Sequence, residues 1–182
     1  MAVSDGSFKD KFGTAAWVIE GCRSDGRLEG QCIIPGGPED QSAYRSELGG
    51  LYAIAAMVQV ICELHNIQEG SIEVACDGMN ALAQVGEADP IIRPNGAQYD
   101  IIAATQAKIK RTNIQWKMRH VMGHQDDTQG CTVMDRWETL NCRMDEQAKQ
   151  HWLQHSTRMT RVQAAVDGEP WAVWMGSSKI CR

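Results

Sequence analysis

The sequence lacks the cysteine pattern of a zinc-binding or disulfide-stapled domain. None of its seven cysteines forms a Cys-X-X-Cys pair, and their odd number argues against a closed disulfide framework. It also has no continuous apolar run long enough to cross a bilayer, and no basic segment followed by an apolar stretch at its start. These absences predict a protein with free thiols that is not secreted, makes no membrane contact and lies inside the cell, in the cytoplasm or the nucleus.

Positive charge is scarce in the chain as a whole but is concentrated in one segment. The formal net charge is −5, which argues against a general nucleic-acid-binding protein. Between Thr105 and Gln125, however, five Lys or Arg residues and two histidines occur without any acidic residue. The segment is either a basic surface patch or the solvated end of a helix followed by a strand.

Internal repeats and low-complexity tracts are also absent, and the 182 residues suit one domain. Apolar alternation and helical spacing predict the secondary structure. The expected strands are 1–4, 14–19, 28–34, 71–76 and 114–121, and the expected helices are 42–65, 79–85, 98–111 and 140–155. Ser42 is the expected N-cap of the long helix. This order predicts an α/β fold in which a mixed sheet is flanked by helices.

Four acidic residues occupy unusual positions in this pattern. Asp5 and Asp77 each follow an apolar strand, where side chains of an α/β sheet commonly face a ligand crevice. Glu47 falls on the apolar stripe of the long helix, and Asp145 lies on the core-facing side of the last helix. A cap, a turn or an ion pair explains any one of them, but four such placements together favour a shared site.

Carboxylates gathered at low dielectric repel one another unless cations neutralise them. Hard divalent ions with oxygen ligands, Mg²⁺ above all, do so, and two ions about 4 Å apart can promote phosphodiester hydrolysis. No Cys or His ligand set competes with this interpretation. The acids therefore predict a magnesium site that acts on phosphate esters.

Four stretches carry a resemblance to a known family. In order, SDGSFKD with GTAAWVI, SAYRSELGGLYAI, VACDGMNAL, and HVMGHQDD with NCRMDEQAK resemble the four motif regions of the ribonuclease H family. The resemblance is closest to RNase H domains of retroelement reverse transcriptase polyproteins. It covers residues 1–155 and implies a five-stranded mixed sheet of order 3-2-1-4-5. The tail, 156–182, is expected to add a small strand or hairpin in EPWAVWMG that packs on the same domain.

The resemblance also implies an activity and a role for each acid. The activity is Mg²⁺-dependent hydrolysis of the RNA strand of RNA/DNA hybrids with two ions, for which Mn²⁺ can substitute. Asp5 would touch both ions. Glu47 and Asp77 would bind one of the two ions, and Asp145 would bind the other ion together with the attacking water. His124 would assist proton transfer or product release. Asp135 remains the alternative fourth acid, because the segment between His124 and Asp145 is long.

Substrate contacts are less well matched by the motifs. The family typically has Asn or Gln just before the helix glutamate, where this sequence has Ala43 and Tyr44. The expected substrate-binding residues are Gly6, Ser7, Ser42, Arg45 and Asn80. Fewer groups that read the 2′-hydroxyl leave two alternatives open: a nuclease with relaxed substrate choice and an inactive RNase H-like interaction module.

The basic helix that some members use to hold substrate is also missing from the sequence. Only four residues precede Asp5, which favours a domain cut from a longer polyprotein. The expected partners are therefore an RNA/DNA hybrid and a reverse transcriptase domain, with the isolated domain a monomer.

Overall fold

Five strands form one mixed sheet in the computed structural model, which describes residues 1–21, 26–86, 98–123, 134–156, 174–175 and 178–179. The strands are β1 (Ala2–Lys9), β2 (Phe12–Glu20), β3 (Arg27–Ile33), β4 (Ser71–Cys76) and β5 (Gln115–His120). Their order is β3-β2-β1-β4-β5; the first three are antiparallel, and β1, β4 and β5 run parallel. The predicted α/β fold and strand order are confirmed.

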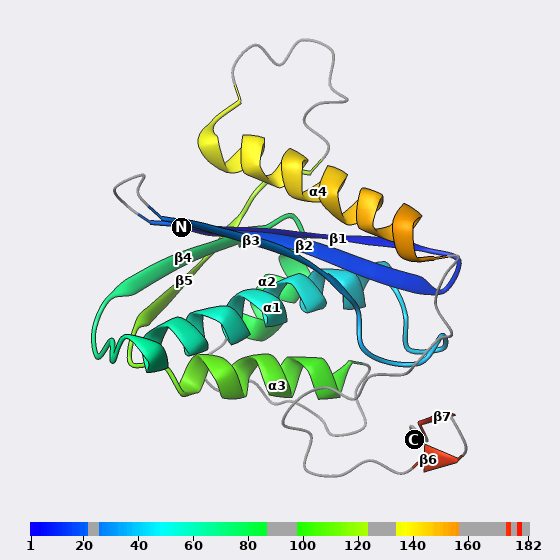
Figure 1. Cartoon of the computed structure of the whole chain (residues 1–182), viewed down its shortest axis with the longest axis horizontal. Coiled ribbons are helices and arrows are strands. Elements are labelled where there is room, and N and C mark those ends of the chain that lie inside the picture. Colours follow the sequence, from blue (N-terminus) through cyan, green and yellow to red (C-terminus); the bar gives the residue numbers. More distant parts are fainter. Residues whose placement is uncertain (22–25, 87–97, 124–133, 157–173, 176–177, 180–182) are drawn as a thin grey trace.

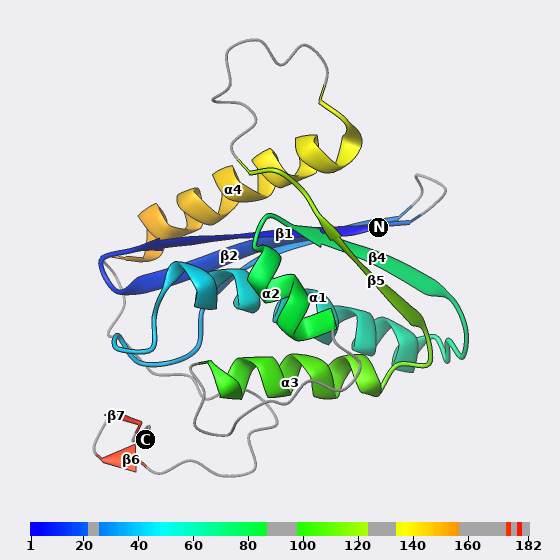
Figure 2. The same cartoon turned by 180° about the vertical axis from the view of Figure 1, so that it is seen from behind.

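Helices cover both faces of this sheet. On one face lie α1 (Ala43–Leu64), α2 (Met79–Gly86) and α3 (Tyr99–Lys110), and on the other lies α4 (Arg136–His155) (Figure 1). The view from behind shows the same two layers of helices, with α2 beside α1 (Figure 2). Two apolar clusters fill the spaces between sheet and helices, a larger one under α1 and a smaller one under α4.

The long helix α1 forms the centre of the larger cluster. It begins after Ser42, the predicted N-cap, whose hydroxyl accepts a hydrogen bond from the Arg45 amide at 3.0 Å. The residues of its predicted apolar stripe are buried: Leu48, Leu51, Ile54, Ala55, Val58 and Cys62. No segment was expected to be apolar enough to cross a membrane, but by length and composition α1 could do so. Half of that stretch is buried inside the protein, as in the core helix of an α/β domain.

The first strand is longer than predicted. It was expected to stop before Asp5, but β1 continues to Lys9, which pairs with Phe12. Asp10 and Lys11 both have positive φ (52° and 58°), so they make the tight turn that keeps β1 and β2 paired to their ends. Burial nevertheless stops at Asp5: residues 2–5 are buried, and the strand becomes progressively exposed beyond them.

The helix α4 begins four residues earlier than the expected Leu140. Asp135 forms a capping box: its carboxylate accepts from the Glu138 amide at 2.9 Å, and the Glu138 carboxylate accepts from the Asp135 amide at 2.9 Å. This reciprocal cap fixes the helix start, so the connection before α4 is shorter than predicted.

The tail contains the predicted small hairpin. Strands β6 (Trp174–Met175) and β7 (Ser178–Lys179) pair antiparallel and form a sheet of their own. The rest of the tail lies outside the described residues, so its packing on residues 1–155 stays a prediction.

Candidate functional site

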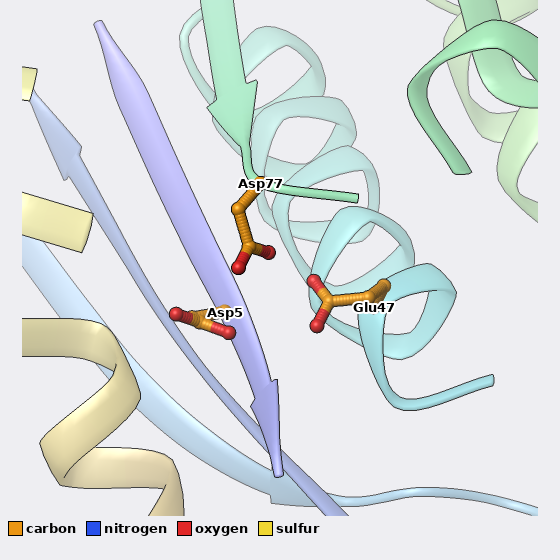
Figure 3. Close-up of side chains that lie close together, drawn as sticks. All are labelled: Asp5, Glu47 and Asp77. Carbon is orange, nitrogen blue, oxygen red and sulfur yellow. The ribbon is translucent and has the colours of Figure 1, made fainter. Parts of the chain in front are cut away.

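Three of the four predicted acids converge at one edge of the sheet. Asp5 comes from β1, Asp77 follows β4 and Glu47 comes from α1; one carboxylate oxygen of each lies within 4.8 Å of the other two. Figure 3 shows the three side chains pointing toward one another. We call this group the three-carboxylate site.

The strand register brings the two aspartates together. In the parallel pair of β1 and β4, Ala2 lies opposite Val74 and Val3 opposite Ala75. The same register, continued past the end of β4, places Asp5 level with Asp77. The parallel register is therefore sufficient to make these carboxylates neighbours, although β1 itself continues to Lys9.

Gly6 allows α1 to bring Glu47 to the same point. A Cβ at Gly6 would lie 2.6 Å from the Ser46 carbonyl carbon and 2.7 Å from the Glu47 nitrogen, which is closer than real contacts allow. The absence of a side chain at Gly6 thus permits the helix backbone to lie directly on β1. The Gly6 N–H donates to Asp5 Oδ1 at 2.6 Å, and its predicted contact with substrate stays a prediction.

Burial and repulsion by neighbouring carboxylates disfavour the charged forms of Asp5 and Glu47. Burial, followed by the charges of Asp77 and Asp145, raises the pKa of Asp5 to about 8, against the opposing effects of the Gly6 amide and Lys149. Burial, followed by Asp5 and Asp77, raises the pKa of Glu47 well above its usual range. Glu47 Oε2 is buried and has no hydrogen-bond partner.

These observations fit a hard divalent cation. The site supplies oxygen ligands alone, its carboxylates repel one another, and one buried ligand oxygen is unpaired. The residues present could hold Mg²⁺ or Mn²⁺.

The fourth predicted acid lies beside this group. Asp145, on α4, is not among the three acids that lie within 4.8 Å of one another in the described part of the chain. Its Oδ2 accepts from Lys149 Nζ at 2.5 Å, and its charge contributes to the raised pKa of Asp5. The alternative acid, Asp135, is the exposed N-cap ten residues earlier, about 15 Å along the helix.

Asn141 belongs to the site and was missed by the sequence analysis. Its side chain is 1% exposed, Nδ2 donates to Asp5 Oδ2 at 3.3 Å, and Oδ1 is buried without a partner. Its position four residues before Asp145, on the buried side of the same helix, was the available signal.

The predicted substrate residues lie in varied surroundings. The Ser7 carbonyl accepts from Ser46 Oγ at 3.2 Å, and the Ser42 hydroxyl caps α1. Asn80 is exposed in the first turn of α2, three residues after Asp77. His124 lies outside the described residues, so its role stays a prediction.

Arg45 was expected to contact substrate, and the structure places its side chain in the core. Its side chain is 2% exposed and donates to both Asp100 carboxylate oxygens, at 2.8 and 2.6 Å. The same guanidinium donates to the Pro35 carbonyl at 2.7 Å and to Gln98 Oε1 at 2.5 Å. It ties α1 to α3 and to the segment before α1, and a contact with substrate backbone would require these bonds to break.

No family model and no curated protein matches the chain. Solved structures do match its fold. RNase H1 from the halophilic archaeon Halobacterium salinarum NRC-1 is 16% identical, with a TM-score of 0.54 over 84% of this chain and 96% of that one. LC11-RNase H1, solved in complex with an RNA/DNA hybrid, is 13% identical, with a TM-score of 0.59 over 82% and 93% of the two chains.

A third structure is the N-terminal RNase H domain of a Mycobacterium tuberculosis protein, solved as a fusion with maltose-binding protein. It is 14% identical, with a TM-score of 0.54 over 85% of this chain and 97% of that one. At these sequence identities the structural similarity bears on the fold alone. It agrees with the strand order and the helix placement observed here. The chain has the ribonuclease H fold.

Proposed function

We propose that this chain is a divalent-metal-dependent ribonuclease H that hydrolyses the RNA strand of RNA/DNA hybrids. The observation that carries the proposal is the three-carboxylate site, in which the buried Asp5 of β1 meets the partly buried Glu47 of α1 and Asp77 after β4 within 4.8 Å on the ribonuclease H fold. A neighbour with this fold, LC11-RNase H1, was solved with an RNA/DNA hybrid.

Asp5, Glu47 and Asp77 would hold Mg²⁺, and Asp145 would complete a second ion position. Mn²⁺, which accepts the same oxygen ligands, should replace Mg²⁺. When bound, such ions activate a water and stabilise the leaving oxygen of a phosphodiester.

The chain's own groups orient the acids. The Gly6 N–H donates to Asp5 Oδ1 and the Asn141 amide donates to Asp5 Oδ2, so both oxygens of this carboxylate are fixed in direction. Hydrogen bonds to ligand oxygens of this kind typically change metal affinity 10- to 100-fold when they are removed. We further propose that His124 moves a proton during turnover or product release, as its motif position implies.

The substrate would lie over the exposed part of β1 and the N-termini of α1 and α2. The proposed substrate contacts are the residues that border this region, Gly6, Ser7, Ser42 and Asn80. Arg45 would act on this region from the core, through its ion pair. Ala43 is exposed at the first position of α1 and offers no amide that could read a 2′-hydroxyl.

That observation supports a second candidate function, a nuclease of the same mechanism that accepts duplex RNA or DNA as well. A third, an inactive interaction module, is the weakest, since all four acids are present. The proposal also includes a reverse transcriptase domain joined to this chain, and the motif resemblance is the support for that part.

Cleavage of three end-labelled substrates tests the proposal: an RNA/DNA hybrid, duplex RNA and duplex DNA, each with Mg²⁺ and with Mn²⁺. We expect the hybrid alone to be cut, and only in its RNA strand. Asp5→Asn should abolish cleavage, whereas Glu69→Gln, at an exposed acid far along the chain, should not. Cutting of all three substrates would favour the relaxed nuclease, and no cutting of any would favour the interaction module.

A further inference from the structure

Three polar side chains line the face of α4 that meets Asp5. Asn141, Asp145 and Lys149 follow one another at intervals of four residues, which places them on one side of a helix. The first donates to Asp5, and the last donates to Asp145 at 2.5 Å. The stripe therefore presents an amide, a carboxylate and an ammonium group in turn along the edge of the three-carboxylate site.

The ammonium group also acts on the three-carboxylate site itself. Asp145 raises the pKa of Asp5, whereas Lys149 lowers it. The positive charge is therefore close enough to offset part of the negative charge that gathers around Asp5. Among the described cations of α4, Lys149 is the one whose charge lowers the pKa of Asp5.

The carboxylate is held in place, while the ammonium group has room to move. The α4 backbone is anchored where the Ala148 carbonyl accepts from Thr14 Oγ1 at 2.7 Å, and Met144 and Ala148 are fully buried. The Asp145 side chain is 16% exposed and the Lys149 side chain 54% exposed. A long side chain with this exposure can turn into solvent without any movement of the helix.

We propose that Lys149 is the built-in counter-cation of Asp145: it occupies this carboxylate in the ion-free protein and must turn away before Asp145 can ligate a divalent ion. The inference rests on the proposed function, because it assumes that Asp145 belongs to a second ion position. It follows that the three-carboxylate site binds its ion first and that Lys149 weakens the second position selectively.

Titration of the full chain with Mn²⁺, without nucleic acid, tests this inference. Free Mn²⁺ is followed by electron paramagnetic resonance in the wild type and in Lys149→Met, which keeps the length of the side chain and removes its charge. We expect the second ion to bind roughly three- to tenfold more tightly in Lys149→Met. This range corresponds to the loss of a partly exposed ion pair and of the repulsion between the ammonium group and the ion. The affinity for the first ion should change less than that for the second, because Lys149 pairs with Asp145, which the first ion does not use.

Two further variants control the result. Lys149→Arg keeps the positive charge and should bind both ions as the wild type does, within about twofold. Asp145→Asn removes the proposed ligand of the second ion, so adding Lys149→Met to it should no longer tighten the second ion. Equal melting temperatures in excess chelator would show that the exposed substitutions at position 149 leave the fold intact.

Each failure has a separate meaning. A second ion that binds Lys149→Met no better than the wild type, or that is absent from both, would overturn the inference while leaving the first ion and hybrid cleavage in place. Tightening that persists without the Asp145 carboxylate would overturn it as well. A wild type that binds no Mn²⁺ at all would overturn the inference and the proposed function together.

Discussion

Replacing Asp5 by Asn should stabilise the metal-free protein above neutral pH. Burial, Asp77 and Asp145 raise the pKa of Asp5 from 3.8 to about 8, so the folded protein holds a proton there that the unfolded chain has lost. Between these two pH values the folded state binds more protons than the unfolded state, and stability therefore falls as pH rises. Asn has nearly the shape of Asp and never ionises, so the variant should escape this loss.

The structure sets the size of the effect. One pKa unit corresponds to about 1.4 kcal/mol, so the full difference is of the order of 5 kcal/mol, as an upper limit. The surroundings contribute with both signs: Asp77 after β4 and Asp145 on α4 raise the pKa of Asp5, whereas the Gly6 amide and Lys149 lower it. Asn141 can rotate its amide so that its unpaired Oδ1 accepts from the new Asn side chain.

Urea unfolding in excess chelator, at about pH 5 and about pH 8, provides the assay. We expect the wild type to lose several kcal/mol of unfolding free energy between the two conditions, and Asp5→Asn to lose clearly less. Adding Mg²⁺ at about pH 8 should restore the wild type and leave the variant unchanged. Glu69→Gln, at an exposed acid, should follow the wild type. Identical pH dependence in the wild type and Asp5→Asn would refute the assignment of a buried, repelled carboxyl to Asp5.

Three other substitutions test the construction of the site. Asn141→Ala should lower Mn²⁺ affinity about tenfold or more by releasing Asp5, measured by the same titration; unchanged affinity would show that the amide does not orient the ligand. Gly6→Ala should cost about 1–3 kcal/mol of stability in urea and weaken ion binding, because its Cβ would push Glu47 away; a stable variant with normal affinity would contradict the close approach. Arg45→Met should cost about 3 kcal/mol, since it removes both hydrogen bonds that the guanidinium donates to the partly buried Asp100 carboxylate; a large loss of substrate affinity at unchanged stability would instead make Arg45 a surface ligand.

The acids of the site were predictable because their positions follow simple geometric rules. Asp5 and Asp77 follow apolar runs that end at the same edge of a parallel pair, and Glu47 interrupts an apolar stripe of α1. The convergence of these three residues follows from these features, whereas the strand order was implied by the motif resemblance. The full length of β1 was not predictable, because Asp10 and Lys11 adopt a turn that the residue types alone do not specify.

Partners between distant residues could not be predicted from local patterns. Arg45 was expected to contact substrate, and its ion pair could not be predicted because its partner, Asp100, is 55 residues away. Asn141 was overlooked for the same reason, since its bond to Asp5 spans 136 residues. Asp135 could be judged only once the reciprocal bonds of its capping box to Glu138 were visible.

Strand-specific cleavage by the wild type and by Glu47→Gln tests the central claim most directly. With both strands of an RNA/DNA hybrid labelled, the wild type should cut the RNA strand when Mg²⁺ is added, leave the DNA strand intact and stop when chelator is added. Glu47→Gln should leave both strands intact at any Mg²⁺ concentration, since it removes the charge of the α1 ligand, whereas Glu63→Gln, on the exposed end of the same helix, should cut normally. Undiminished RNA cleavage by Glu47→Gln, or cleavage by the wild type in chelator, would contradict the account.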